Sequence, residues 1–345
     1  MSKARPELTA GRFFGLLAVF SVWSLILAFA CTFVGSAPTP PGRALSLLAG
    51  AQPTGKDAGY VLILMQLRVP RVALAFLAGG GLAVAGAVFQ ALLRNPLATP
   101  HTLGVSSCGA LGAVIAFALG LSNVRFAVFG PVQIFSLAGS LSAIGLIYAL
   151  ARQRERFSTF KLLLAGVTLG LICSAMIMFV RYIAKPHELV MVDRWLMGGL
   201  DVHGYRNLAS VLPLFLPALV LLFSQANSLN QLAFGEELAT GRGINVRSVQ
   251  AWSFVAGSVL TASVVSVAGP IGFVGLIVPH VFRLMLGPDH RVLLMASFFG
   301  GGTFLVLADT FARTVLAPTE LPVGMLTAMM GGPFFLVLLM RRGRW

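Results

Sequence analysis

Residues 68–93 read RVPRVALAFLAGGGLAVAGAVFQALL, and after Arg71 this stretch contains no charged side chain. A helix that crosses a lipid bilayer needs about 20 mostly apolar residues. The stretch meets that length, and Pro70 suits the first turn of a helix, where a missing N–H is no loss. We therefore interpret it as a membrane-spanning helix that begins beside two arginines.

The composition of the whole chain favours the same environment. Of its 345 residues, 57% are hydrophobic and 10% are charged, and the mean hydropathy is +0.89. An ordinary soluble domain has about 25% charged residues, and a soluble chain could not hide this much apolar surface from water. The sequence predicts an all-α polytopic membrane protein. The net charge of +14 does not indicate nucleic-acid binding, because the basic residues form short clusters between apolar runs.

Similar apolar runs recur along the chain, which we treat as one transmembrane domain over residues 1–345. Basic clusters at 152–156 and 341–344 indicate the inner side of the membrane, so the N- and C-termini are both expected in the cytoplasm. About ten spanning helices are predicted, at 13–34, 68–92, 102–120, 131–151, 161–184, 206–224, 248–268, 272–287, 291–308 and 321–340.

Two connections between these runs are long. We expect an outer loop at 35–67, rich in Pro and Gly, and an inner loop at 225–247 with a weak helical pattern. Such a pattern predicts a short amphipathic helix that lies on lipid or binds a partner. The residues spaced for its one apolar face are Leu229, Leu232, Ala233 and Leu238.

Two Pro-His dipeptides hint at an internal repeat. Pro100-His101 and Pro279-His280 each lie close to a helix boundary, five expected helices apart. An odd offset inverts the two halves in the membrane, an arrangement common in transporters. A chance match of two dipeptides is the alternative.

No pattern in the chain indicates catalysis. GAQPTGKD at 50–57 contains the G-x-x-x-x-G-K of a phosphate-binding loop, but Asp57 stands where Ser or Thr must reach magnesium. The histidines are scattered, and the three cysteines lie in apolar surroundings without metal-ligand spacing, as small buried hydrophobes do. We expect no catalytic residue, no metal site and no cofactor in this chain.

Glycine is frequent inside the apolar runs, as at Gly79, Gly80, Gly81 and Gly86. In lipid, glycine allows two helix backbones to approach closely, so these residues predict tight helix packing. Pore lining is the alternative interpretation.

Arg68 and Arg71 are three residues apart, so they share one face of a helix. Both guanidinium groups are expected together on the outer surface. They either anchor the helix at the lipid headgroups or bind carboxylates of an extracytoplasmic partner, which arginine holds with two parallel hydrogen bonds.

Five stretches of the chain carry a family resemblance. They are RVPRVALAFLAGGGLAVAGAVFQALLRNPLATPHTLGVSSCGALGAV at 68–114, LLLAGVTLGLICSAM at 162–176, RWLMGGLDVHGYRNL at 194–208, GPIGFVGLIVPHVFRLMLGPDHR at 269–291 and ADTFARTVLAPTELPVGMLTAMMGGPFFLVLL at 308–339. In this order they resemble the iron-chelate, haem and cobalamin permeases of binding-protein-dependent ABC importers, the FecCD type. The resemblance implies a ten-helix permease that works as a homodimer. It also implies two cytoplasmic ATPase subunits, which bind ATP and magnesium, and a periplasmic binding protein.

The resemblance further implies roles for individual residues. Arg68, Arg71 and Arg313 match the arginines that receive glutamates from the two lobes of the binding protein. Ser158 and Thr159 match the cytoplasmic gate. The inner segment that couples the permease to the ATPase matches residues 236–246, with Glu236, Glu237, Gly241, Gly243 and Asn245.

We therefore predict a permease subunit in the bacterial inner membrane that moves a metal chelate from periplasm to cytoplasm. The chelate is a ferric siderophore, haem or cobalamin, and ATP hydrolysis takes place on the partner subunits. A secondary transporter with inverted repeats is the alternative, and it would need titratable groups at mid-membrane, which are almost absent. A passive channel would need a selectivity filter, and none is evident.

Overall fold

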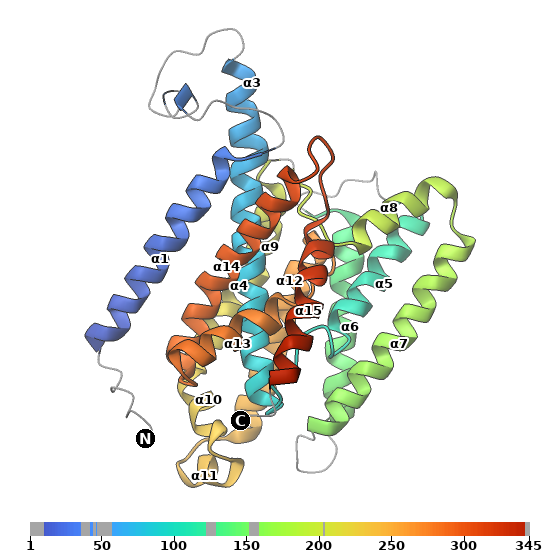
Figure 1. Cartoon of the computed structure of the whole chain (residues 1–345). Helices are drawn as coiled ribbons and strands as arrows, with labels where there is room; N and C mark the ends of the chain where they lie inside the picture. Colours follow the sequence, from blue (N-terminus) through green and yellow to red (C-terminus); the bar gives the residue numbers. More distant parts are fainter. Residues whose placement is uncertain are drawn as a thin grey trace.

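The computed structural model describes residues 10–35, 42–43, 46, 57–121, 129–151, 159–202 and 204–341. These residues form a bundle of helices (Figure 1). The helices are α1 Ala10–Phe33, α3 Asp57–Leu62, the π-helix η1 Ile63–Arg68, α4 Val69–Leu92, α5 Val105–Ala118, α6 Pro131–Ala151, α7 Thr159–Ile183, α8 Pro186–Leu196, α9 Arg206–Ser224, α10 Ala226–Ala233, α11 Glu236–Gly241, α12 Val246–Ala268, α13 Val274–Leu286, α14 His290–Thr314 and α15 Val323–Arg341.

Each of the ten predicted apolar segments forms a helix. Seven helices of the described ranges are long and apolar enough to cross a membrane, and α5, α13 and residues 323–337 of α15 are shorter apolar helices. The all-α polytopic class is therefore confirmed. The count of ten membrane spans stays a prediction.

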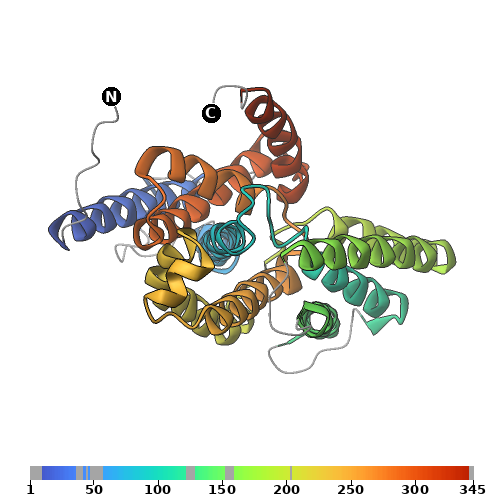
Figure 2. The same ribbon diagram turned by 90° about the horizontal axis from the view of Figure 1, so that it is seen from below.

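Helix α4 occupies the centre of the bundle, with α12, α13 and α14 packed around it (Figure 2). A Cβ atom on Gly86 would overlap the backbone carbonyl of Gly275 in α13, and one on Gly79 would overlap the carbonyl of Gly301 in α14. At these positions glycine lets the helix backbones touch. The predicted close packing is confirmed here, and these glycines face neighbouring helices.

The two ends of the bundle carry different elements. The start of α1, helices α10 and α11 and the end of α15 lie at one end, which we call the α11 end (Figure 1). Helices α3 and α8 and the connection between α14 and α15 lie at the opposite end, which we call the α3 end. The two sites described below lie at these opposite ends.

Two helices depart from the sequence expectation. The predicted outer loop at 35–67 is wrong in its last part, because residues 57–68 form α3 and η1 and continue into α4. Helix α8 was not expected, although its start is encoded locally. Pro186 occupies its first turn, and the Glu188 carboxylate accepts a hydrogen bond from the Lys185 N–H at 3.0 Å.

The two Pro-His dipeptides occupy unlike positions. Pro100 lies in the turn before α5, whereas Pro279 lies inside α13. The two short helices do share another feature, since each begins after a residue with positive φ, Gly104 at 74° and Phe273 at 66°. The internal repeat stays a prediction, supported by these helix starts and not by the dipeptides.

All three cysteines are buried, as the apolar surroundings predicted. The Sγ atoms of Cys108 in α5 and Cys173 in α7 are 3.0 Å apart. They fill space between two helices.

Candidate functional sites

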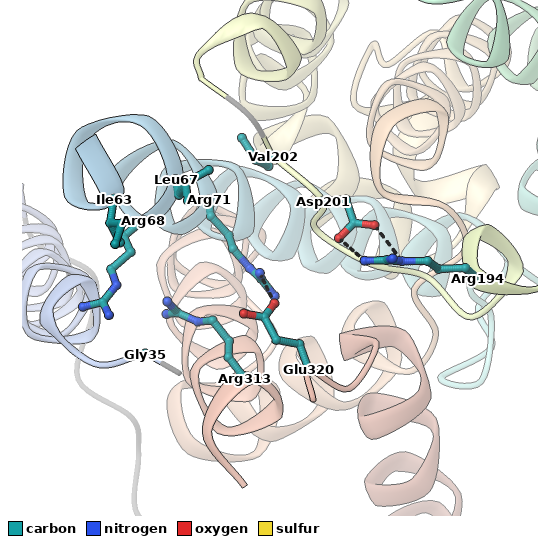
Figure 3. Close-up of a pocket in the computed structure, with 10 residues that line it drawn as sticks. All are labelled: Gly35, Ile63, Leu67, Arg68, Arg71, Arg194, Asp201, Val202, Arg313 and Glu320. Atoms are coloured by element: carbon teal, nitrogen blue, oxygen red, sulfur yellow. Dashed lines mark hydrogen bonds and ion pairs between the residues drawn. The ribbon is translucent and has the colours of Figure 1, made fainter. Parts of the chain in front are cut away.

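Three arginines from separate turns line one pocket at the α3 end. Arg68 ends η1, Arg71 lies in the first turn of α4, and Arg313 lies in the last turn of α14. Pro70 lies in that same first turn of α4 and lacks an N–H. The pocket, which we call the arginine pocket, has a volume of about 310 Å³ (Figure 3). It is lined by Gly35, Ile63, Leu67, Arg68, Arg71, Arg194, Asp201, Val202, Arg313 and Glu320.

Arg71 binds two carboxylates of its own chain. Its Nη2 lies 2.9 Å from Asp309 Oδ1, and its Nε lies 3.1 Å from both oxygens of that carboxylate. Its Nη1 donates to Glu320 Oε2 at 2.6 Å. A guanidinium held on two edges by carboxylates has a fixed orientation.

Asp309 also holds the second arginine of the pocket. Arg313 Nε lies 3.2 Å from Asp309 Oδ2, one helical turn away on α14. Arg313 Nη2 donates to Thr310 Oγ1 at 3.0 Å and to the Cys31 carbonyl of α1 at 3.3 Å. The Asp309 carboxylate therefore lies between two arginines, and its side chain is only 1% exposed.

Arg68 turns toward α1 instead. Its Nη1 donates to the Phe33 carbonyl at 3.0 Å, and its guanidinium lies against Gly35 (Figure 3). The spacing correctly predicted that Arg68 and Arg71 share one site. The expectation that both guanidinium groups stand on the surface is wrong for Arg68, which is 4% exposed, because the end of α1 covers it.

A further ion pair lies at the rim of the pocket. Arg194 Nε lies 3.1 Å from Asp201 Oδ2, and both side chains are largely exposed (Figure 3). No role was predicted for Asp201, Asp309 or Glu320. For Asp309 a signal was present, because Asp and Arg four residues apart in a helix form an ion pair.

The α10–α11 segment, residues 226–241, lies at the other end of the bundle. Leu229 and Leu232 are buried in the protein core, whereas Leu238 is 57% exposed. The prediction of one buried apolar face is therefore wrong for Ala233 and Leu238, which are both exposed. The chain breaks at Gly235, whose φ is +122°, so that α11 starts in a new direction.

Asn230 forms hydrogen bonds that join α10 to the start of α14. Its Nδ2 donates to Asp289 Oδ1 at 2.7 Å, and its Oδ1 accepts from the His290 N–H at 2.8 Å. Burial alone would raise the pKa of Asp289, but hydrogen bonds from Arg291 and Asn230 outweigh it and lower that pKa below its ordinary value. The Asp289 carboxylate is therefore charged at neutral pH and caps α14.

Four of the five residues predicted for ATPase coupling, all except Gly241, line an open groove of about 1330 Å³ beside this segment. Glu236 Oε1 accepts from Gln250 Nε2 at 3.1 Å and lies 4.0 Å from Arg94 Nη2. Asn245 accepts from the Ser248 N–H at 3.1 Å and so caps α12. Gly241 is the last residue of α11. The groove is lined by Arg94, Phe234, Gly235, Glu236, Glu237, Leu238, Thr240, Gly243, Ile244, Asn245, Val246, Arg247 and Gln250.

The sequence pattern of the FecCD transport family matches residues 23–341. The chain belongs to the FecCD transport family. It is 38% identical over 280 residues to the hemin transport system permease protein HmuU of Yersinia pestis, covering 81% of this chain and 84% of that protein. It is 38% identical over 304 residues to the vitamin B12 import system permease protein BtuC of Escherichia coli (strain SE11), covering 87% of this chain and 91% of that protein.

The fold of this FecCD chain has been seen before. A solved inward-facing metal-chelate type ABC transporter matches it with a TM-score of 0.79 at 27% sequence identity. The match covers 95% of this chain and 99% of the other. Family membership and fold therefore agree over nearly the whole length.

The predicted cytoplasmic gate of this FecCD chain is only partly described. Ser158 lies outside the described residues, and Thr159 is the first residue of α7. The roles assigned to the gate, to the arginines and to the coupling residues all stay predictions. Among the described residues, no group of three or more His, Cys, Asp or Glu side chains is placed to hold a metal ion.

Proposed function

We propose that this protein is the permease subunit of an ABC importer that moves a metal chelate into the cytoplasm. The family match over residues 23–341 carries the proposal. Two relatives, which match 81% and 87% of this chain, are named as hemin and vitamin B12 permeases. The chelate is a ferric siderophore, haem or cobalamin. The permease itself has no cofactor, and ATP is hydrolysed on two partner ATPase subunits.

The orientation that we propose places the two ends of the bundle on opposite sides of the membrane. The α3 end faces the periplasm and the α11 end faces the cytoplasm, so the ten helices cross the bacterial inner membrane with both termini inside. Basic clusters at 152–156 and 341–344 support this orientation, because cytoplasmic segments carry an excess of Lys and Arg.

At the periplasmic end, the arginine pocket receives carboxylates from the two lobes of a soluble binding protein. Arg71 supports this role because its side chain is 15% exposed and arginine binds carboxylates in a two-point geometry. Arg68 and Arg313 are buried beneath the pocket surface and contribute positive charge to it. The pocket then draws the loaded binding protein to the membrane surface.

At the cytoplasmic end, the groove beside α11 receives an ATPase subunit. Glu236, Glu237, Gly243 and Asn245 line the groove, and Gly241 ends α11 just before the turn. Closure of the ATPase pair on ATP moves this segment, and the helices near Ser158 and Thr159 open the path.

Two copies of the chain form the transporter. Helix α7 supports this pairing because it is one of the least buried helices in the bundle, with Phe160, Leu171 and Phe179 all more than 60% exposed. Helix α15 carries a second exposed apolar set that includes Met329 and Leu336. Apolar faces of this kind are covered by lipid or by another subunit.

Uptake into proteoliposomes tests the proposal. The permease, its ATPase and its binding protein are reconstituted, and uptake of hemin, a ferric hydroxamate and cyanocobalamin is measured with ATP enclosed. We expect uptake of one of these chelates that requires both ATP and the binding protein. A non-hydrolysable ATP analogue serves as the control. Uptake that follows a proton or sodium gradient without the ATPase would overturn the proposal.

A further inference from the structure

The two carboxylates on Arg71 are held in unlike ways. Asp309 lies within helix α14, is 1% exposed, and also pairs with Arg313. Glu320 lies in the connection between α14 and α15, and its side chain is 38% exposed. Residues 315–320 of this connection are all exposed. Asp309 is therefore a permanent ligand of Arg71, whereas Glu320 lies where it can leave toward solvent.

Asp309 and Glu320 bind different nitrogen atoms of Arg71, and of the two carboxylates only Glu320 lines the arginine pocket. Asp309 accepts from Nε and Nη2 of Arg71. Glu320 accepts from Nη1 at 2.6 Å, and Figure 3 shows this pair. A guanidinium group has a limited number of N–H donors in fixed directions. A carboxylate arriving from outside needs the Nη1 edge of Arg71 and therefore meets Glu320 there.

We propose that Glu320 is an exchangeable ligand of Arg71, which an incoming carboxylate of the soluble partner displaces. This inference rests on the docking role of the arginine pocket given under the proposed function. Glu320 keeps Arg71 paired while no partner is bound, and it returns when the partner leaves. The residue therefore lowers the affinity for the partner and speeds its release.

The displaced carboxylate exchanges its hydrogen bond to Arg71 for hydrogen bonds to water. The Glu320 side chain is partly in water before the exchange and moves fully into water afterwards, so its desolvation is relieved. The incoming carboxylate keeps the charge on Arg71 neutralised. The exchange replaces one charge-assisted hydrogen bond by another of the same kind.

Binding of the soluble partner to the permease–ATPase complex in nanodiscs tests the inference. Glu320→Gln keeps the size of the side chain but removes its charge, so the Nη1 edge of Arg71 becomes available. We expect the Kd to fall about 5- to 10-fold, mainly through slower dissociation. Glu320→Ala should also lower the Kd. This second variant verifies that the tighter binding does not come from new hydrogen bonds of the amide group that Glu320→Gln introduces.

Asp201→Asn is the matched control. It removes one negative charge from the same pocket but leaves the Arg71–Glu320 pair in place. The Arg194–Asp201 pair is exposed, so freeing Arg194 changes the affinity little. We expect the Kd to change less than about 2-fold. If Glu320→Gln and Asp201→Asn tighten binding equally, the effect comes from the change in net charge alone, and the inference is overturned.

Arg71→Gln separates this inference from the docking proposal. Unchanged binding in Arg71→Gln sinks the docking proposal itself. Weaker binding in Arg71→Gln, together with unchanged or weaker binding in Glu320→Gln, leaves docking intact and overturns only the exchange. Basal ATP hydrolysis by the complex in each variant verifies that the permease is folded and assembled.

Discussion

The arginine pocket and the groove beside α11 differ in how deeply their ion pairs are buried. In the pocket, Arg313 and Asp309 are 3% and 1% exposed and lie 3.2 Å apart. In the groove, Arg94 and Glu236 are 51% and 47% exposed and lie 4.0 Å apart. Arg313 and Asp309 lie on the long helix α14, whereas Glu236 lies on the six-residue helix α11 and Arg94 lies in the turn after α4.

This difference has an energetic meaning. Removing one member of a buried ion pair leaves an uncompensated charge in a medium of low dielectric, which is strongly destabilising. An exposed pair loses little, because water and salt screen both charges. The buried charges of Arg313 and Asp309 are therefore part of the fold, whereas exposed charges, such as those of Arg94 and Glu236, are available to a partner.

The largest effect is expected for Asp309→Asn. The substitution leaves Arg71 and Arg313 without their shared counter-charge, and we expect it to lower the free energy of unfolding by about 3–5 kcal/mol. Thermal unfolding of the purified permease in detergent measures this loss. Asp193→Asn is the control, since Asp193 pairs with Arg181 at 2.8 Å on the surface, and it should cost less than about 1 kcal/mol. Equal losses in the two variants would contradict the division between fixed and available charges.

An intermediate effect is expected for Asn230→Leu. The variant removes the hydrogen bonds that join α10 to Asp289 and His290, and we expect a local loss of about 1–3 kcal/mol. Hydrogen exchange of the α10 amides reports the loosening. Asn207→Leu at the α3 end, where the amide donates to the Asp201 carbonyl at 3.1 Å, should leave α10 unchanged. Protection of α10 equal to that of the unaltered protein would show that its apolar contacts alone hold it.

The smallest effect on stability is expected for Glu236→Gln. Its bonds are exposed, so the free energy of unfolding should fall by less than about 1 kcal/mol. Co-purification of the ATPase subunit should nevertheless decrease, since the groove loses a charged group. Thr240→Ala, in the same groove, is the uncharged control. A loss of stability comparable with that of Asp309→Asn would break the comparison between the two sites.

Much of the fold was predictable from apolar runs, because every segment of suitable length became a helix. Helix α8 and the helical part of residues 57–68 were missed for different reasons. Helix α8 is short and amphipathic, although Pro186 and Glu188 mark its start. Residues 57–68 follow a turn-rich stretch, and apolarity alone does not place the start of a helix.

The candidate sites were predictable only where the signal was local. The spacing of Arg68 and Arg71 placed both in one pocket, and the spacing of Asp309 and Arg313 could have done the same. No local pattern brings Glu320 to Arg71, because the two are 249 residues apart and meet only when α14 packs against α4. The burial of Arg68 likewise depends on α1, a helix distant in sequence.

One helix takes part in both sites. Helix α14 begins at His290, whose backbone is bound to Asn230, and its last turns carry Asp309 and Arg313. At a rise of about 1.5 Å per residue, the helix is a lever of about 35 Å. A tilt of about 5° about its first residue, His290, would displace the C-terminal end of α14 by about 3 Å, the length of a hydrogen bond. A tilt of that size at the α11 end would therefore be large enough to change the hydrogen bonds of Asp309 near the α3 end.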